Sequence, residues 1–123
     1  MNKMRQELKE KLLKRDPTCA IGGGRAQDLH EIVCPPLDGG KYTPNDTPLA
    51  RIVYSEENCV LLCNKCNVME ANNLRDRLIR HNMDIYGIDH IVTVYRNMAS
   101  WLKSPRSWIP ESVLYGDEWV KIL

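Results

Sequence analysis

The chain has 123 residues, of which 43% are hydrophobic and 27% are charged, and its net charge at pH 7 is +1. This length predicts a single domain, residues 1–123, with one modest core. No apolar run approaches the length that spans a membrane, and the charged start lacks the apolar stretch of a signal peptide. We therefore expect a cytoplasmic protein that has no membrane partner. The low net charge argues against a protein that binds nucleic acid over an extended surface, but it allows a local basic face.

The first segment, residues 2–15, has the pattern of an amphipathic helix. Met4, Leu8 and Leu12 recur at helical spacing among basic residues. The helix is expected to end before Pro17, since the residue that precedes a proline disfavours helical geometry. Its basic side chains are expected to be solvated, and a face that contacts phosphates is the alternative.

Short apolar runs in the middle of the chain predict strands. Residues 18–24 contain three consecutive glycines and predict a turn, and residues 26–33 then predict a short strand. A segment rich in proline and glycine follows at 34–46 and predicts a loop. The β-branched or aliphatic runs 50–54 and 59–62 predict two further short strands.

The second half of the chain predicts helices. A helical pattern starts at Val68, breaks at Tyr86 and Gly87, and resumes over residues 88–102. Residues 104–123 contain prolines and tryptophans and predict a short helix or a docking tail. The first of these helices places three arginines on its outward face, where they are candidates for phosphate contacts: Arg75, Arg77 and Arg80.

Cysteine spacing predicts a metal site. Cys63 and Cys66 form a C-x-x-C pair at the end of the 59–62 run, and without a secretion signal such a pair indicates metal binding more than disulfides. A closed zinc site needs two more ligands. Cys19 is the natural third, whereas the position that would complete a second pair holds Gly22. Cys34 is the candidate substitute across the sheet; otherwise the site has decayed and packing alone holds the fold. The fifth cysteine, Cys59, is expected to face the core.

One histidine lies in a setting that indicates catalysis. Asp28 and Glu31 place carboxylates on both sides of His30. Phosphodiester cleavage needs a base that activates water and a divalent cation that stabilises the departing oxygen. Imidazole titrates near neutrality and suits the base, while carboxylates suit Mg²⁺ or Mn²⁺. Asn58, just before the 59–62 run, could orient the imidazole through its side-chain oxygen.

Together these segments resemble the HNH endonuclease family, the ββα-metal nucleases common in phages and mobile elements. The resemblance covers about residues 17–82 and implies an α+β fold in which two antiparallel strands and a helix surround one catalytic metal, with a cysteine-bound zinc behind it. Helices flank this core at both ends, with a C-terminal helical extension over about 83–123. The matching residues are Cys19, Leu29-His30-Glu31-Ile32-Val33, Asn58-Cys59-Val60-Leu61-Leu62, Cys63, Cys66 and Asn67.

Two positions depart from the pattern of that family. Asn67 stands where the final histidine is expected, so the chain resembles an H-N-N variant with an amide oxygen on the metal. The His-Glu dipeptide leaves two registers open. Either His30 is the base, with Asp28 or Glu31 on the metal, or His30 is a metal ligand and Glu31 is the base. We favour His30 as the base, because no other histidine lies within the matched segments. The other two are expected at the surface or in helix packing: His81 and His90.

The resemblance implies a metal-dependent DNA endonuclease with Mg²⁺ or a similar cation. Its partner would be DNA, and its setting would be the cytoplasm of a bacterial host if the chain derives from a phage. One alternative is a non-catalytic zinc-knuckle module that binds nucleic acid or protein. Another is a phage accessory protein whose tail after Ser104 contacts a packaging or host protein. The oligomeric state is left open.

Overall fold

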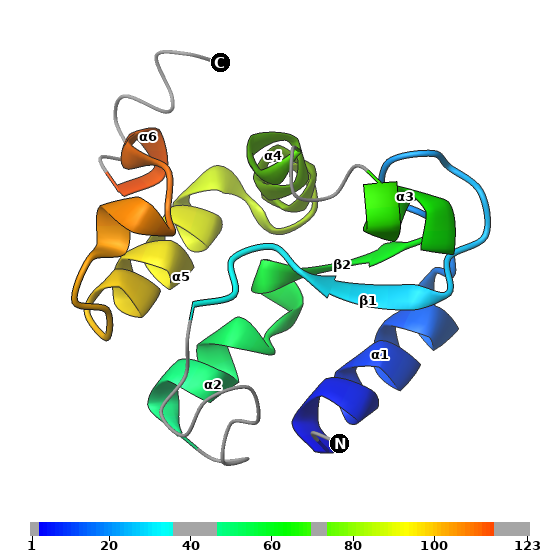
Figure 1. Ribbon diagram of the computed structural model, residues 1–123, viewed down its shortest axis with the longest axis horizontal. Coiled ribbons are helices and arrows are strands. Elements are labelled where there is room, and N and C mark those ends of the chain that lie inside the picture. Colours follow the sequence, from blue (N-terminus) through cyan, green and yellow to red (C-terminus); the bar gives the residue numbers. More distant parts are fainter. Residues whose placement is uncertain (1–2, 36–46, 70–73, 115–123) are drawn as a thin grey trace.

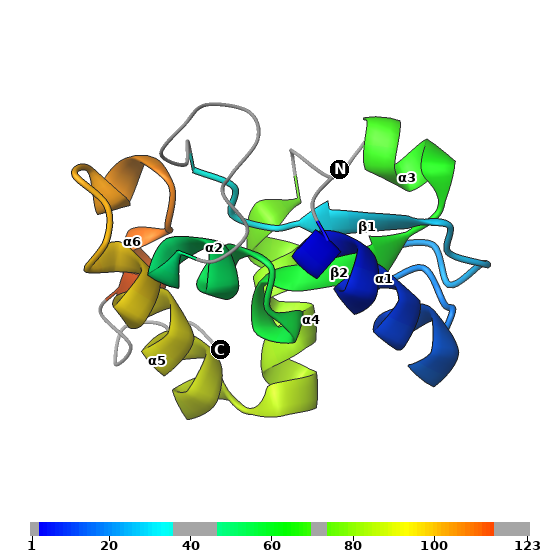
Figure 2. The ribbon, with the colours of Figure 1, turned by 90° about the horizontal axis from the view of Figure 1, so that it is seen from below.

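The computed structural model describes residues 3–35, 47–69 and 74–114 and shows a mixed α+β protein, with helices around a two-stranded antiparallel sheet (Figures 1 and 2). None of the helices in this part of the chain combines the length and the apolar character that crossing a bilayer requires. The elements are α1 (Lys3–Arg15), β1 (Asp28–Glu31), α2 (Pro48–Val53), η1 (Glu56–Asn58), β2 (Cys59–Leu62), α3 (Asn64–Met69), α4 (Arg75–Tyr86), α5 (Ile88–Ala99), η3 (Pro105–Ser107) and α6 (Glu111–Leu114).

The sheet separates two apolar clusters. Strand β1 pairs with β2 so that Leu29 lies opposite Leu61 and His30 lies opposite Val60. Because side chains alternate along a strand, the leucine pair faces one side and the His30 pair faces the other. Helix α1 covers the leucine side, and α3 and α4 lie on the other side (Figure 1). The cluster on the α1 side consists of Leu8, Leu12, Ala26, Leu29, Cys59 and Leu61.

The larger cluster fills the space between the sheet and the C-terminal helices. Helix α5 is its centre, since Ile91, Tyr95 and Met98 recur at helical spacing and are fully buried. Helices α4 and α5 join directly at Gly87, whose φ of 94° is a conformation that favours glycine. The break predicted at this position is confirmed.

Other predicted helices and strands are present, but with different bounds. The N-terminal helix is present as α1, the run 59–62 is strand β2, and the strand expected over 26–33 is reduced to Asp28–Glu31. The helix expected from Val68 already begins at Asn64 as α3, and α4 starts at Arg75. The predicted loop lies outside the described residues from position 36 to 46, and the predicted tail does so beyond position 114.

The strand predicted over residues 50–54 is wrong, because this segment is helix α2. Thr47 caps the helix by accepting a hydrogen bond from the Ala50 N–H, and Pro48 occupies the first turn. A threonine cap followed by proline favours a helix start. The apolar residues that suggested a strand instead bury one helical face, which includes Ala50 and Val53.

Candidate functional site

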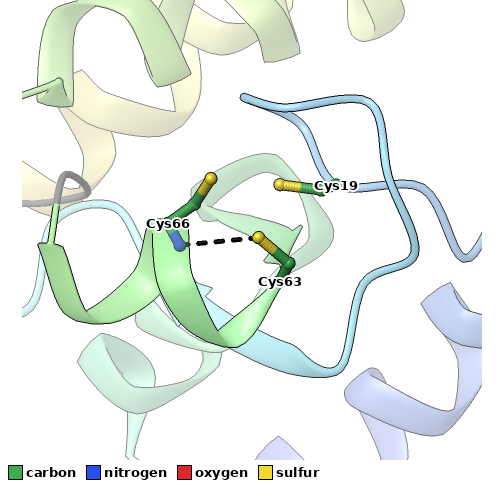
Figure 3. Close-up of side chains that lie close together, drawn as sticks. All are labelled: Cys19, Cys63 and Cys66. Carbon is green, nitrogen blue, oxygen red and sulfur yellow. Dashed lines mark hydrogen bonds between the residues drawn. The ribbon is translucent and has the colours of Figure 1, made fainter.

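Three of the five cysteines gather beside the sheet. Their Sγ atoms all lie within 4.8 Å of one another (Figure 3). Cys19 comes from the turn before β1, whereas Cys63 and Cys66 come from the end of β2 and the first turn of α3. In a tetrahedral site with Zn–S bonds of about 2.3 Å the sulfurs are roughly 3.8 Å apart, so a small contraction would suffice. The cluster could therefore hold a metal ion such as Zn²⁺.

The two turns that carry these cysteines share one hydrogen-bond pattern. The Gly22 N–H donates to Cys19 Sγ at 3.4 Å, and the Cys66 N–H donates to Cys63 Sγ at 3.5 Å. In each turn the next residue donates its N–H to the carbonyl oxygen of the first cysteine, at 3.0 Å. Gly22 thus occupies the place in its turn that Cys66 occupies in the other.

The thiols of the cluster differ in acidity. Burial raises the pKa of Cys19, but backbone N–H groups of Gly22 and Cys63 and neighbouring groups outweigh it and lower the pKa to about 7. The interaction with Cys63 raises the pKa of Cys66 to about 12, and burial adds to this. Because metal ligation requires thiolates, binding here would release protons.

The remaining cysteines lie elsewhere. Cys34 is exposed and does not belong to the group, so the prediction that it is the fourth ligand is wrong. The reason is the strand direction. Asp28 pairs with Leu62 beside the cluster, while Cys34 follows the opposite end of β1. Cys59 is buried as predicted, with its thiol donating to the Val53 carbonyl at 3.3 Å.

His30 is half-buried on the face of β1 that looks toward α3 and α4. Burial lowers the pKa of its imidazole, Glu31 raises it, and the positive charges of Arg75 and Arg5 lower it. The side chain of Asn67 also interacts with the imidazole by hydrogen bonding and raises its pKa. The net shift is downward, so the ring is neutral at pH 7, the form that accepts a proton or binds a metal.

Asn58 makes no hydrogen bond to His30 among those of the described residues, because its side chain is directed into the core. It is fully buried, its Oδ1 accepts from the Val33 N–H at 3.1 Å and the Tyr95 hydroxyl at 2.8 Å, and its amide donates to the carbonyls of Val33 and Val53. Both lone pairs and both N–H groups are therefore used. The prediction that Asn58 orients His30 is wrong, because the side chain ties the segment after β1 to α2 and α5.

A second buried asparagine, Asn82 of α4, was missed by the sequence analysis. Its amide donates to the carbonyls of Glu57 and Cys59, both at 3.0 Å, and so holds the start of β2. His81 next to it contacts its side-chain oxygen, and His90 contacts Glu57. In the sequence, the signal for a buried Asn82 was its place as a polar residue on the apolar face of a predicted helix.

The two acids beside His30 differ in setting. Glu31 accepts a hydrogen bond from Arg5 Nε at 2.7 Å, and Arg5 also donates to the Leu29 carbonyl. This ion pair ties Glu31 to α1, on the opposite side of the sheet from His30. Asp28, by contrast, shares the face of His30. Glu31 is therefore engaged by Arg5, while His30 and Asp28 lie on the other face of the sheet.

Four arginines line one open groove of about 820 Å³ at the start of α4, and Asp76 also lines it. All three arginines proposed from the sequence belong to it. Arg75 is half-buried and donates to the Trp108 carbonyl at 3.0 Å, so it also anchors the C-terminal segment. Arg106, which the sequence analysis missed, enters from η3. The four are Arg75, Arg77, Arg80 and Arg106.

The face of His30 offers a sparse ligand set for a catalytic cation. It provides an imidazole, the Asn67 amide and the Asp28 carboxylate. Across the described ranges, the cysteine cluster is the one group of three His, Cys, Asp or Glu residues whose ligand atoms lie within 4.8 Å. A Mg²⁺ site on the face of His30 therefore stays a prediction.

Comparisons of the chain with protein-family models, with curated proteins and with solved structures gave no match. The function is therefore inferred from the residues of this chain and their geometry.

Proposed function

We propose that the protein is a metal-dependent endonuclease of HNH type that hydrolyses phosphodiester bonds in DNA. One observation carries the proposal. A half-buried imidazole whose pKa is lowered, His30, lies close enough to Asn67 for that side chain to raise its pKa, on the face where β1, β2 and α3 meet, and the nearby Arg75 lines the four-arginine groove. A base next to a groove lined by arginines is an arrangement suited to attack on a phosphodiester.

His30 is the general base of the proposed reaction. Its free nitrogen takes a proton from a water molecule, which then attacks the phosphorus. Asn67 is the positioning residue, because an amide oxygen that accepts from the imidazole N–H fixes the tautomer and raises the pKa, in the direction found here. Arg75 and the other groove arginines hold the phosphates on either side of the bond that breaks.

A divalent cation, when bound, would stabilise the negative charge on the departing oxygen. Asp28 is the carboxylate available on the His30 face, since Glu31 is engaged by Arg5. Asn67 is a second oxygen donor. An amide oxygen has two lone pairs, so one that accepts from His30 would still have one lone pair for a cation. Zn²⁺ in the cysteine cluster has a separate role, because it would lock the turn before β1 to the start of α3.

The test is a supercoiled-plasmid cleavage assay over Mg²⁺, Mn²⁺ and Ni²⁺. We expect the natural protein to cut and His30→Ala to lose activity by about 10²- to 10⁴-fold. His90→Ala removes an exposed histidine that pairs with Glu57 and is the matched control, with unchanged cleavage. Equal cleavage by the two variants would refute His30 as the base.

The second candidate is a non-catalytic zinc module that binds nucleic acid. The observation in its favour is that the cysteines are the strongest metal-ligand cluster among the residues described. On this alternative, plasmid DNA stays intact with every cation, while the protein still binds a labelled duplex. Loss of duplex binding in Arg77→Ala would then locate the binding surface at the arginine groove.

A further inference from the structure

The position of Gly22 leaves one corner of the cysteine cluster unfilled. Its turn has the same hydrogen bonds as the turn of Cys63 and Cys66, so the fourth sulfur of a closed site would come from residue 22. A Cβ built at Gly22 lies 3.6 Å from Cys66 Sγ and meets no other atom within 4 Å. The side-chain space at residue 22 therefore faces the cluster and is open.

The same corner is open to solvent. Gly22 is exposed and Cys63 is half-buried, while Cys19 and Cys66 are buried. Among the residues described, no fourth His, Cys, Asp or Glu joins the group. A tetrahedral ion held by three thiolates keeps one position for a ligand from solution, as zinc sites with three protein ligands do.

We propose that the cysteine cluster binds Zn²⁺ through Cys19, Cys63 and Cys66 and keeps an exchangeable fourth ligand at the position of Gly22. In water this ligand is a solvent molecule. A small thiol displaces it as the thiolate, which forms a fourth metal–sulfur bond and releases one proton and the water. This inference rests on the zinc site of the proposed function and adds a coordination position that accepts small soft ligands.

Cobalt substitution tests the inference, because the thiolate-to-cobalt charge-transfer absorption grows with the number of bound thiolates. We expect three thiolates per Co²⁺ in the natural protein and four after 2-mercaptoethanol is added. Gly22→Cys should show four from the start and no response to the thiol. It should also hold Zn²⁺ at least tenfold more tightly against a chelator, since its fourth ligand is already in place.

Two variants serve as controls. Gly24→Cys adds a cysteine to the same loop, where a Cβ meets nothing within 4 Å, and it should behave as the natural protein does. Cys34→Ser removes the exposed thiol that lies outside the cluster and should also leave the spectra unchanged.

The outcomes separate the two levels of the proposal. If the natural protein binds no Co²⁺ or Zn²⁺, the zinc site of the proposed function fails. If it binds the metal but shows four thiolates at once, or three that do not respond to 2-mercaptoethanol, the site stands and the open position is refuted.

Discussion

Two asparagines of this chain, Asn58 and Asn67, have the same side chain and opposite surroundings. Asn58 is buried, and all four of its hydrogen-bonding positions are used by neighbours. Asn67 is half-buried on α3, where it interacts with the imidazole of His30. A saturated amide can only hold structure together, whereas a partly used amide at an accessible face can serve chemistry. The comparison separates the residues that stabilise the fold from those that form the proposed site.

The largest expected effect is on the buried side of this comparison. Asn58→Ala leaves polar groups of Val33, Val53 and Tyr95 unsatisfied in the core. We expect a loss of about 4 kcal/mol in the free energy of unfolding, measured by urea denaturation. Asn64→Ala, at an exposed position of α3, is the matched control and should change it by less than about 0.5 kcal/mol. A loss below about 1 kcal/mol for Asn58→Ala would contradict the role given to its four bonds.

The sequence predicted this difference poorly because burial is a property of the assembled fold. Asn58 precedes β2, whose pairing with β1 places His30 opposite Val60, and spacing alone cannot say which groups a side-chain amide will bond. The partners of Asn58 come from the segment after β1, from α2 and from α5, and α2 had been predicted as a strand.

The cysteine cluster was better predicted, because two of its three ligands lie within one turn. A C-x-x-C pair fixes two sulfurs within one turn, and Cys19 follows from its place before β1. The sequence could not exclude Cys34, because that required knowledge of the strand direction. The place of Arg106 in the groove could not be read from the sequence, because it follows from η3 lying beside α4, where Arg75 donates a hydrogen bond to the Trp108 carbonyl.

The second effect concerns the accessible side of the comparison. Asn67→Ala removes the partner of the His30 imidazole and should slow plasmid cleavage by about 10- to 100-fold, the usual cost of losing such an orienting group. It should lower the free energy of unfolding by less than about 1 kcal/mol, since the side chain is not in the core. If Asn67→Ala is destabilised as strongly as Asn58→Ala, then Asn67 also stabilises the fold and the contrast between the two asparagines is contradicted.

A smaller effect is expected in the arginine groove. Arg77 is exposed and lines the groove, so Arg77→Ala should weaken duplex binding about fivefold for every sequence and reduce the slope of log affinity against log salt by about 1. The control is Lys14→Ala, an exposed cation of α1 on the opposite side of the sheet. If both variants lower the slope equally, the groove is not the binding surface.

The smallest effect is the pH response of His30. Burial lowers the pKa of its imidazole in the folded protein below the ordinary value of 6.5, so the unfolded chain takes up its proton at a higher pH than the folded one. Protonation then favours unfolding, and His30 should reduce stability as the pH falls below about 6.5 and have no such effect above it. An NMR titration of the ring without divalent cations, assigned with His30→Gln, measures the shift directly. Asn67→Ala should move the pKa further down, because the interaction with Asn67 raises it. A pKa at or above 6.5 in the folded protein would mean that burial and the arginines do not outweigh Glu31 and Asn67, and it would contradict the proposal of a neutral base.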